Sequence, residues 1–138
     1  MSRIILTAAA ALAVAALVVP AAMAASSSTP VAIVNSAKFG KVLATAKGHL
    51  AFYTWTREKD NKVHCTGDCA KVWPPILVPK GTTVTAHVKG AMGVFGTIKR
   101  PDGSTQLTFN KRPLYTFHGD TATKILCNGV DGWFVVKA

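Results

Sequence analysis

The chain has 138 residues, of which 49% are hydrophobic, and a formal net charge of +10. This length is enough for one domain with a buried core. Lysine supplies twelve of the sixteen positive charges, whereas proteins that read nucleic acids through bidentate contacts favour arginine. The composition therefore excludes nucleic acid as the expected partner.

The N-terminal residues 1–24 have the three parts of a secretory signal peptide. Arg3 supplies a cationic start, residues 4–19 form an apolar run, and residues 22–24 form a small-x-small cleavage site. The apolar run is short for a membrane span, although retention as an anchor is the alternative. No cysteine stands near the cleavage site, so no lipid anchor is expected. Processing would leave a Ser-rich linker at 25–30 and no transmembrane span.

Residues 31–138 predict a single all-β domain with a compact antiparallel sheet. Short apolar or alternating segments, separated by turn residues, are typical of strands. The expected strands are 31–34, 41–45, 50–56, 76–78, 82–88, 94–99, 105–109, 114–117 and 133–137. Residues 100–104 read Arg-Pro-Asp-Gly-Ser, which predicts a hairpin turn because proline presets the turn and glycine accepts a positive φ. No segment predicts an amphipathic helix of ten residues or more.

One segment of the chain returns in weaker form sixty-two residues later. Each copy places an aromatic pair before an acid, then a cysteine, and ends in a tryptophan followed by an apolar run. The corresponding pairs are Tyr53 and Tyr115, Trp55 and Phe117, Glu58 and Asp120, Cys65 and Cys127, and Trp73 and Trp133. This spacing predicts two repeats, at about 38–78 and 94–136, related by a pseudo-twofold axis.

Two motifs in these copies resemble those of a bacterial secreted-repeat family described as predicted lipoproteins. Residues 115–120 fit its Tyr-x-[Phe/Trp/Tyr]-x-x-Asp motif, and residues 65–75 fit Cys-x-Gly-x-Cys-Ala-x-x-Trp-Pro-Pro. The first copy departs from the Tyr motif, since Glu58 stands where Asp is expected. The resemblance covers roughly 38–136 and implies an exported cell-envelope protein without an established biochemical activity.

The three cysteines leave one thiol over if a disulfide forms, as is usual in an exported chain. A Cys65–Cys69 bridge would contribute about 2 kcal/mol on the loop-entropy model, and a Cys65–Cys127 bridge about 4 kcal/mol. The larger loop fits a pseudo-twofold axis. The smaller one requires no assumption about topology and agrees with the family, so Cys65–Cys69 is the preferred pairing and Cys65–Cys127 the alternative.

Six residues of the two copies are candidates for a ligand groove, with the acids at the strand ends. They are Tyr53, Trp55, Glu58, Tyr115, Phe117 and Asp120. Alternatively, the aromatic rings belong to the core and the acids bind backbone amides in turns.

A copper, haem or zinc site is a second possibility. Its soft ligands would be His64, Cys65 and Cys69, completed by His118 or Met92. A thiol-disulfide enzyme would use the same cysteines, but no βαβ unit is visible around them.

The sequence thus predicts an exported, periplasmic or extracellular binding module of the cell envelope, without a cofactor and more plausibly not an enzyme. Its partner would be an anionic envelope polymer or another envelope protein. The alternative function is a copper, haem or thiol redox protein that uses His64, Cys65, Cys69 and His118. A third reading is that the positive charge only keeps the protein soluble.

Overall fold

The computed structural model describes residues 29–138, and it confirms the predicted all-β class. The predicted signal peptide at 1–24 and residues 25–28 of the predicted linker lie outside the described residues. The strands of the described part are β1 (Val31–Ser36), β2 (Gly40–Thr45), β3 (Tyr53–Trp55), β4 (Phe95–Lys99), β5 (Thr105–Phe109), β6 (Arg112–Pro113) and β7 (Trp133–Val135). They are short, so most of the chain runs in turns and extended connections.

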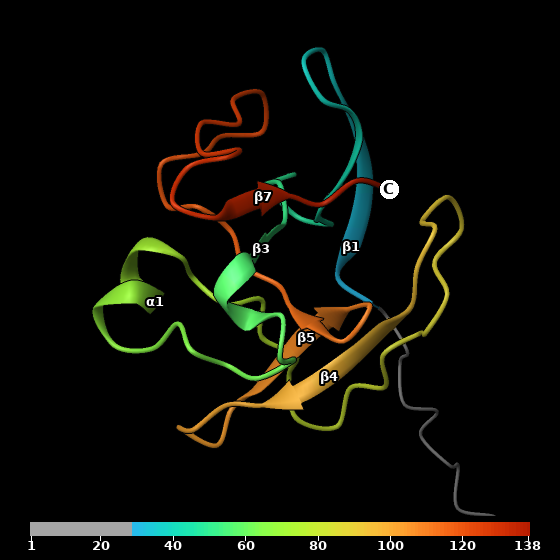
Figure 1. Cartoon of the computed structure of the whole chain (residues 1–138). Helices are drawn as coiled ribbons and strands as arrows, with labels where there is room; N and C mark the ends of the chain where they lie inside the picture. Colours follow the sequence, from blue (N-terminus) through green and yellow to red (C-terminus); the bar gives the residue numbers. More distant parts are fainter. Residues whose placement is uncertain (1–28) are drawn as a thin grey trace, which may run out of the picture.

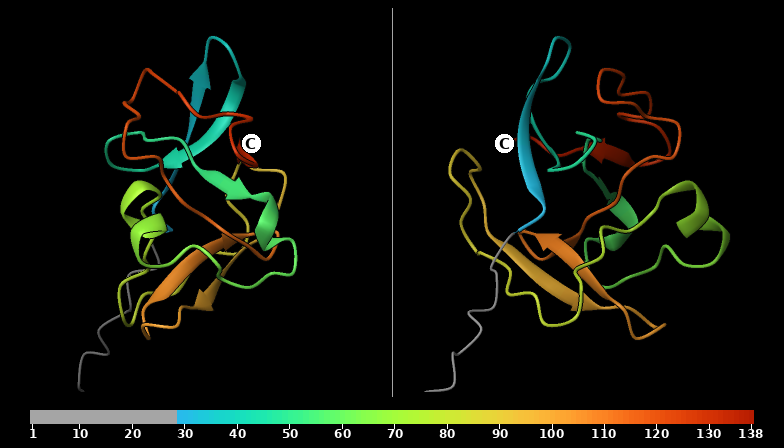
Figure 2. Two further views of the ribbon diagram at one scale, coloured as in Figure 1. Left: turned by 60° about the vertical axis from the view of Figure 1, so that its left-hand side comes forward. Right: turned by 180° about the vertical axis from the view of Figure 1, so that it is seen from behind.

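All strand pairs are antiparallel and form three small sheets. β1 pairs with β2 in a hairpin, β4 pairs with β5 in a second hairpin that β6 extends, and β3 pairs with β7. The two hairpins lie at opposite ends of the molecule, with β3 and β7 between them (Figures 1 and 2). Residues from the middle and the C-terminus of the chain therefore meet at the centre of the fold.

The predicted turn at 100–104 joins β4 to β5. Arg100 and Ser104 close it through a backbone hydrogen bond of 3.0 Å, and Gly103 takes a φ of 83°. Glycine adopts this left-handed conformation without the steric cost that a Cβ atom brings. The local sequence thus specifies this hairpin.

Several expected strands are shorter than predicted, and one is absent. Segment 50–56 contributes only β3, while 76–78 and 114–117 form isolated bridges at Leu77 and Tyr115. The expected strand at 82–88 was wrong. This segment forms single backbone hydrogen bonds instead of a continuous ladder. One example is the bond from Phe95 N–H to the Ala86 carbonyl at 2.8 Å.

A five-residue helix, α1 (Asp68–Val72), follows Cys65 and was not predicted. Its one turn is too short to give a helical periodicity in the sequence. Trp73 ends it and donates its backbone N–H to the Cys69 carbonyl at 2.8 Å. Within residues 29–138, no helix is long and apolar enough to cross a membrane.

The core consists of two clusters of buried side chains. The first contains Leu43, Phe52, Ile76, Val78, Phe95, Leu107, Phe109, Leu114 and Val136. The second contains Val42, Ala51, Tyr53, Cys65, Trp73, Tyr115, Trp133 and Val135. Both clusters draw residues from the two predicted copies, so neither copy has a core of its own.

Candidate functional site

Two buried tyrosines lie at the centre of the second cluster. Tyr53 donates its backbone N–H to the Tyr115 carbonyl at 2.8 Å, and Tyr115 donates back to the Tyr53 carbonyl at 3.0 Å. Neither residue is exposed to solvent. Because the two residues exchange both bonds, they form one antiparallel pair between the two predicted copies.

Each tyrosine hydroxyl donates a hydrogen bond to the acid of the other copy. Tyr53 Oη lies 2.7 Å from Asp120 Oδ2, and Tyr115 Oη lies 2.7 Å from Glu58 Oε1. Glu58 is fully buried and Asp120 is 8% exposed. A buried carboxylate requires such donors, because burial without a partner is costly. The two pairs therefore connect the copies through the core.

The same acids also hold the turns that follow them. Glu58 Oε1 accepts the backbone N–H of His64 at 2.8 Å and of Cys65 at 3.0 Å. Asp120 Oδ1 accepts the backbone N–H of Leu126 at 2.9 Å. Each acid thus sets the position of the segment that carries the next cysteine.

The tryptophan rings pack on the tyrosines in matching ways. Trp73 and Trp133 stack on each other with ring centroids 3.9 Å apart. Tyr53 meets Trp73 edge-on at 5.2 Å, and Tyr115 meets Trp133 edge-on at 5.1 Å. Trp55 covers the Trp133 ring at 5.0 Å. Stacked and edge-on contacts between aromatic rings stabilise a core beyond the area that they bury.

Backbone contacts also occur in corresponding pairs. The backbone N–H of Thr56 donates to the Gly132 carbonyl at 2.9 Å, and the backbone N–H of His118 donates to the Val72 carbonyl at 3.0 Å. Gly132 and Val72 are the residues that precede the two tryptophans. The hairpins correspond as well, beginning at Val31 and at Phe95. These correspondences are what a two-copy chain would give with its axis between Tyr53 and Tyr115. The repeats and their bounds stay a prediction.

Burial raises the pKa of both tyrosines above the usual range, and the hydrogen bond to the carboxylate raises each pKa further. Burial also raises the pKa of Asp120, while the hydrogen bond from Tyr53 opposes this shift. Both phenols therefore keep their protons at neutral pH. In that state they act as hydrogen-bond donors within the core and not as bases.

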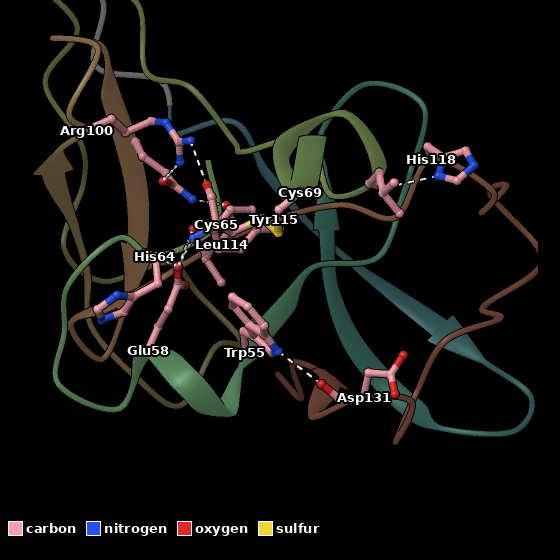
Figure 3. The surroundings of a disulfide bond; sticks show 12 residues. Trp55, Glu58, His64, Cys65, Cys69, Arg100, Leu114, Tyr115, His118 and Asp131 are labelled. Atoms are coloured by element: carbon pink, nitrogen blue, oxygen red, sulfur yellow. Dashed lines mark hydrogen bonds between the residues drawn. A yellow bond between two sulfur atoms is a disulfide. The ribbon is translucent and has the colours of Figure 1, made fainter. Parts of the chain in front are cut away.

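The structure joins Cys65 to Cys69 in a disulfide and leaves Cys127 as a half-buried free thiol. The preferred pairing is therefore the one observed. Arg100 reaches this segment from the β4–β5 turn and donates to the Cys65 carbonyl at 2.9 Å (Figure 3). Its other terminal nitrogen donates to Gln106 Oε1 at 2.6 Å. The guanidinium thus ties the disulfide segment to the second hairpin.

The predicted ligand groove is corrected to a core cluster. Tyr53, Tyr115 and Glu58 are fully buried; the Tyr53 hydroxyl donates to Asp120, and the Tyr115 hydroxyl donates to Glu58. Trp55 and Phe117 are partly buried beside the two stacked tryptophans. The interpretation in which the acids bind backbone amides describes this geometry.

The predicted metal site is not assembled in the structure. The disulfide occupies both cysteine sulfurs, so neither is a thiolate ligand. His64 Nε2 lies 2.7 Å from Asp60, whereas His118 Nδ1 lies near the Val72 carbonyl, and the two rings lie on opposite sides of the disulfide (Figure 3). The described residues contain no group of three or more His, Cys, Asp or Glu that could hold a metal ion.

Solvent meets a surface in which positive charge is in large excess. All twelve lysines and Arg57 are exposed, while the exposed acids are Asp60, Asp68, Asp102 and Asp131. In residues 29–138 Lys71 and Asp68 form an ion pair, and His64 Nε2 lies 2.7 Å from Asp60 Oδ2. Two of the six acids, Glu58 and Asp120, are in the core. Arg100 is also buried and Arg112 is partly buried, so the surface excess of thirteen cations over four acids equals the net charge of +9 that residues 29–138 carry.

A comparison with protein families gives one match. Residues 96–137 fit a family described as a secreted repeat of unknown function. This confirms the predicted resemblance over that range and agrees with the predicted export, while the cysteine motif at 65–75 lies outside the match. No curated protein and no solved structure matches the chain. The matched range nearly coincides with the second predicted copy at 94–136. Residues 96–137 of this chain are thus similar to a family of secreted repeats.

Proposed function

We propose that this protein is an exported binding module that holds an anionic polymer of the cell envelope and performs no catalysis. The observation that supports the proposal most strongly is the surface charge, thirteen exposed cationic side chains against four exposed acids. Lysine ammonium groups attract phosphate or carboxylate groups without demanding a fixed geometry. This suits a polymer in which the same charge recurs along the chain.

Most of the lysines are available for an external partner. Lys71 pairs with Asp68 at 2.7 Å, and it is the one lysine of residues 29–138 that forms an ion pair within 4 Å. Charges that had evolved chiefly for internal stability would be expected to face acids on neighbouring elements. The remaining lysines have no carboxylate within 4 Å in the described part of the chain, so most of their charge is available to an external partner.

The buried cluster supports this function as a scaffold. The tyrosine–acid pairs, the stacked tryptophans and the disulfide fix the two hairpins and the loops between them. A rigid frame keeps the lysines in place and lowers the entropy that is lost on binding. Apart from Glu58 Oε2, which has no hydrogen-bond partner among the described residues, the polar side-chain atoms of the tyrosine–acid pairs form hydrogen bonds within the core, and this favours a structural role for the cluster.

Titration of the purified protein with linear polymers tests the proposal. The probes are polygalacturonate, inorganic polyphosphate and neutral dextran, each at low and at physiological ionic strength. We expect binding to at least one anionic polymer, weakening as salt is added because exposed charges are screened, and no binding to dextran. Failure to bind either anionic polymer at low salt would refute the function and leave solubility as the role of the charge.

A further inference from the structure

A groove lies between the tip of the β1–β2 hairpin and the loop that precedes β7. Figures 1 and 2 show these two segments at the same end of the molecule. One hollow of about 230 Å³ is lined by Lys38 and Phe39 of the tip and by Thr123 and Lys124 of the loop. A neighbouring hollow of about 260 Å³ shares Thr123 and extends along β1 to Asn35. Together the two are of the size of a ligand pocket.

The groove combines positive charge with uncharged hydrogen-bonding groups. Lys38 and Lys124 both line the first hollow, and no carboxylate lines either hollow. Asn35, Ser36 and Thr123 add amide and hydroxyl groups to its walls. A site for a simple anion needs only the charge. Amides and hydroxyls next to apolar surface are the groups that bind a sugar ring.

A third lysine strengthens the charge at one end of the groove. Lys137 donates to the Phe39 carbonyl, and its ammonium group lies 5.4 Å from the centroid of the Phe39 ring. The ammonium group of Lys38 lies 5.3 Å from the same centroid. Two cations on one ring are kept close together at the tip.

The acid nearest in sequence does not cancel this charge at the surface. Asp120 begins the loop, but its side chain points into the core, where its two oxygens accept from Tyr53 Oη and the Leu126 N–H. It is 8% exposed. The loop therefore presents Lys124 outward while its carboxylate is held inward by the central cluster.

We infer that this groove, between residues 35–39 and 122–126, binds an acidic polysaccharide whose carboxylate or phosphate groups contact Lys38 and Lys124. The inference rests on the proposed function and locates it. The concave shape and the hydroxyl and amide groups match a sugar chain, whereas a membrane surface would require a flat or convex face. The other exposed lysines add attraction at longer range.

Two charge-matched variants test the location. Lys38→Gln with Lys124→Gln removes both groove lysines, and Lys80→Gln with Lys99→Gln removes two lysines that line a separate hollow. Both variants lose the same net charge. We expect the groove variant to weaken polygalacturonate binding by about tenfold or more, since a lysine at an anionic surface contributes about 1 kcal/mol. The control variant should weaken it by about twofold.

A further probe separates sugar recognition from charge alone. The groove variant removes charge alone, so it should weaken binding to inorganic polyphosphate as well, and a variant that removes a hydroxyl group is needed to test sugar recognition. Thr123→Val should weaken polygalacturonate binding and leave polyphosphate binding unchanged. Thermal unfolding of each variant, with an unchanged midpoint, shows that the effects are not losses of folding.

Each other outcome overturns the inference in an identifiable way. Equal losses in both double variants would mean that binding is spread over the surface, so the groove would be wrong and the proposed function would stand. Binding to vesicles of phosphatidylglycerol in preference to polygalacturonate would identify a membrane as the partner. No binding of the wild-type protein to either anionic polymer would refute the proposed function itself.

Discussion

The tyrosine–acid pairs predict that Tyr115→Phe costs more stability than Tyr53→Phe. In either variant a buried acid loses its phenol donor. Glu58 is fully buried, and its second oxygen, Oε2, has no hydrogen-bond partner in the structure. Loss of the Tyr115 bond leaves its carboxylate dependent on two backbone amides. Asp120 is 8% exposed and is better able to recruit water.

The magnitudes follow from the type of bond that is lost. A hydrogen bond to a charged group contributes about 1.5–3 kcal/mol, and a buried charged acceptor without its donor adds to the cost. We therefore expect Tyr115→Phe to lower the free energy of unfolding by about 3 kcal/mol and Tyr53→Phe by about 1.5 kcal/mol. Phenylalanine keeps the ring, so the edge-on contacts with Trp133 and Trp73 are retained.

Urea unfolding of the oxidised protein, followed by tryptophan fluorescence, measures both changes. The double variant should lose roughly the sum, because the two hydroxyls bind different acids. Losses below about 0.5 kcal/mol in both single variants would show that the acids do not need these donors. A larger loss for Tyr53→Phe would mean that burial does not rank the two pairs.

The other predictions concern the disulfide, the tryptophans and the buried arginine. Cys65→Ser and Cys69→Ser should each lower the free energy of unfolding by about 2 kcal/mol, and Cys127→Ser by less than about 0.5 kcal/mol. A thiol assay should find one free thiol in the wild-type protein. Equal losses of stability in all three variants would contradict the Cys65–Cys69 pairing. Trp73→Ala and Trp133→Ala should each cost about 3–5 kcal/mol in urea unfolding, because each removes a ring from the stack; a loss under 1 kcal/mol in either would contradict its core position. Arg100→Met should cost about 3 kcal/mol, since it leaves the Cys65 carbonyl and Gln106 Oε1 without donors. A thermal midpoint equal to the wild type would show that water replaces the guanidinium.

Some of the fold was predictable because short-range chemistry specifies it. The Arg-Pro-Asp-Gly-Ser turn predicts the β4–β5 hairpin, and the alternation at 94–99 and 105–109 gives its strands almost to the residue. The segment at 82–88 shows the limit of such patterns. Alternation describes a strand only if a partner edge is available, and tertiary packing decides whether it is.

The residues of the candidate site could be predicted from the sequence, but their hydrogen-bond partners could not. The sequence pairs Tyr53 with Tyr115 and Glu58 with Asp120. It does not indicate that each hydroxyl binds the acid of the other copy, because that contact depends on how the two copies cross. Nor does the sequence show that these two acids are buried. For that reason the ligand groove predicted from the sequence was made of residues that belong to the core.

The location of the lysine-lined groove could not be predicted from the sequence either. Lys38 and Lys124 are far apart along the chain. They line the same hollow only because the β1–β2 tip lies next to the loop before β7. The excess of lysine predicts that the partner is negatively charged. The location of the binding site depends instead on which acids are buried in the fold.

The claim on which the account most depends is that both tyrosines of the chain are buried against acids of the opposite copy. Because the chain has two tyrosines, absorbance at 295 nm during an alkaline titration reports on them alone. Their folded pKa lies above the unfolded one, so the unfolded state releases protons first and stability falls as pH rises above about 10, by about 1.4 kcal/mol per pH unit for each tyrosine. We predict that tyrosinate appears only together with cooperative unfolding in circular dichroism. Ionisation of either tyrosine near pH 10, while the protein stays folded, would contradict the account.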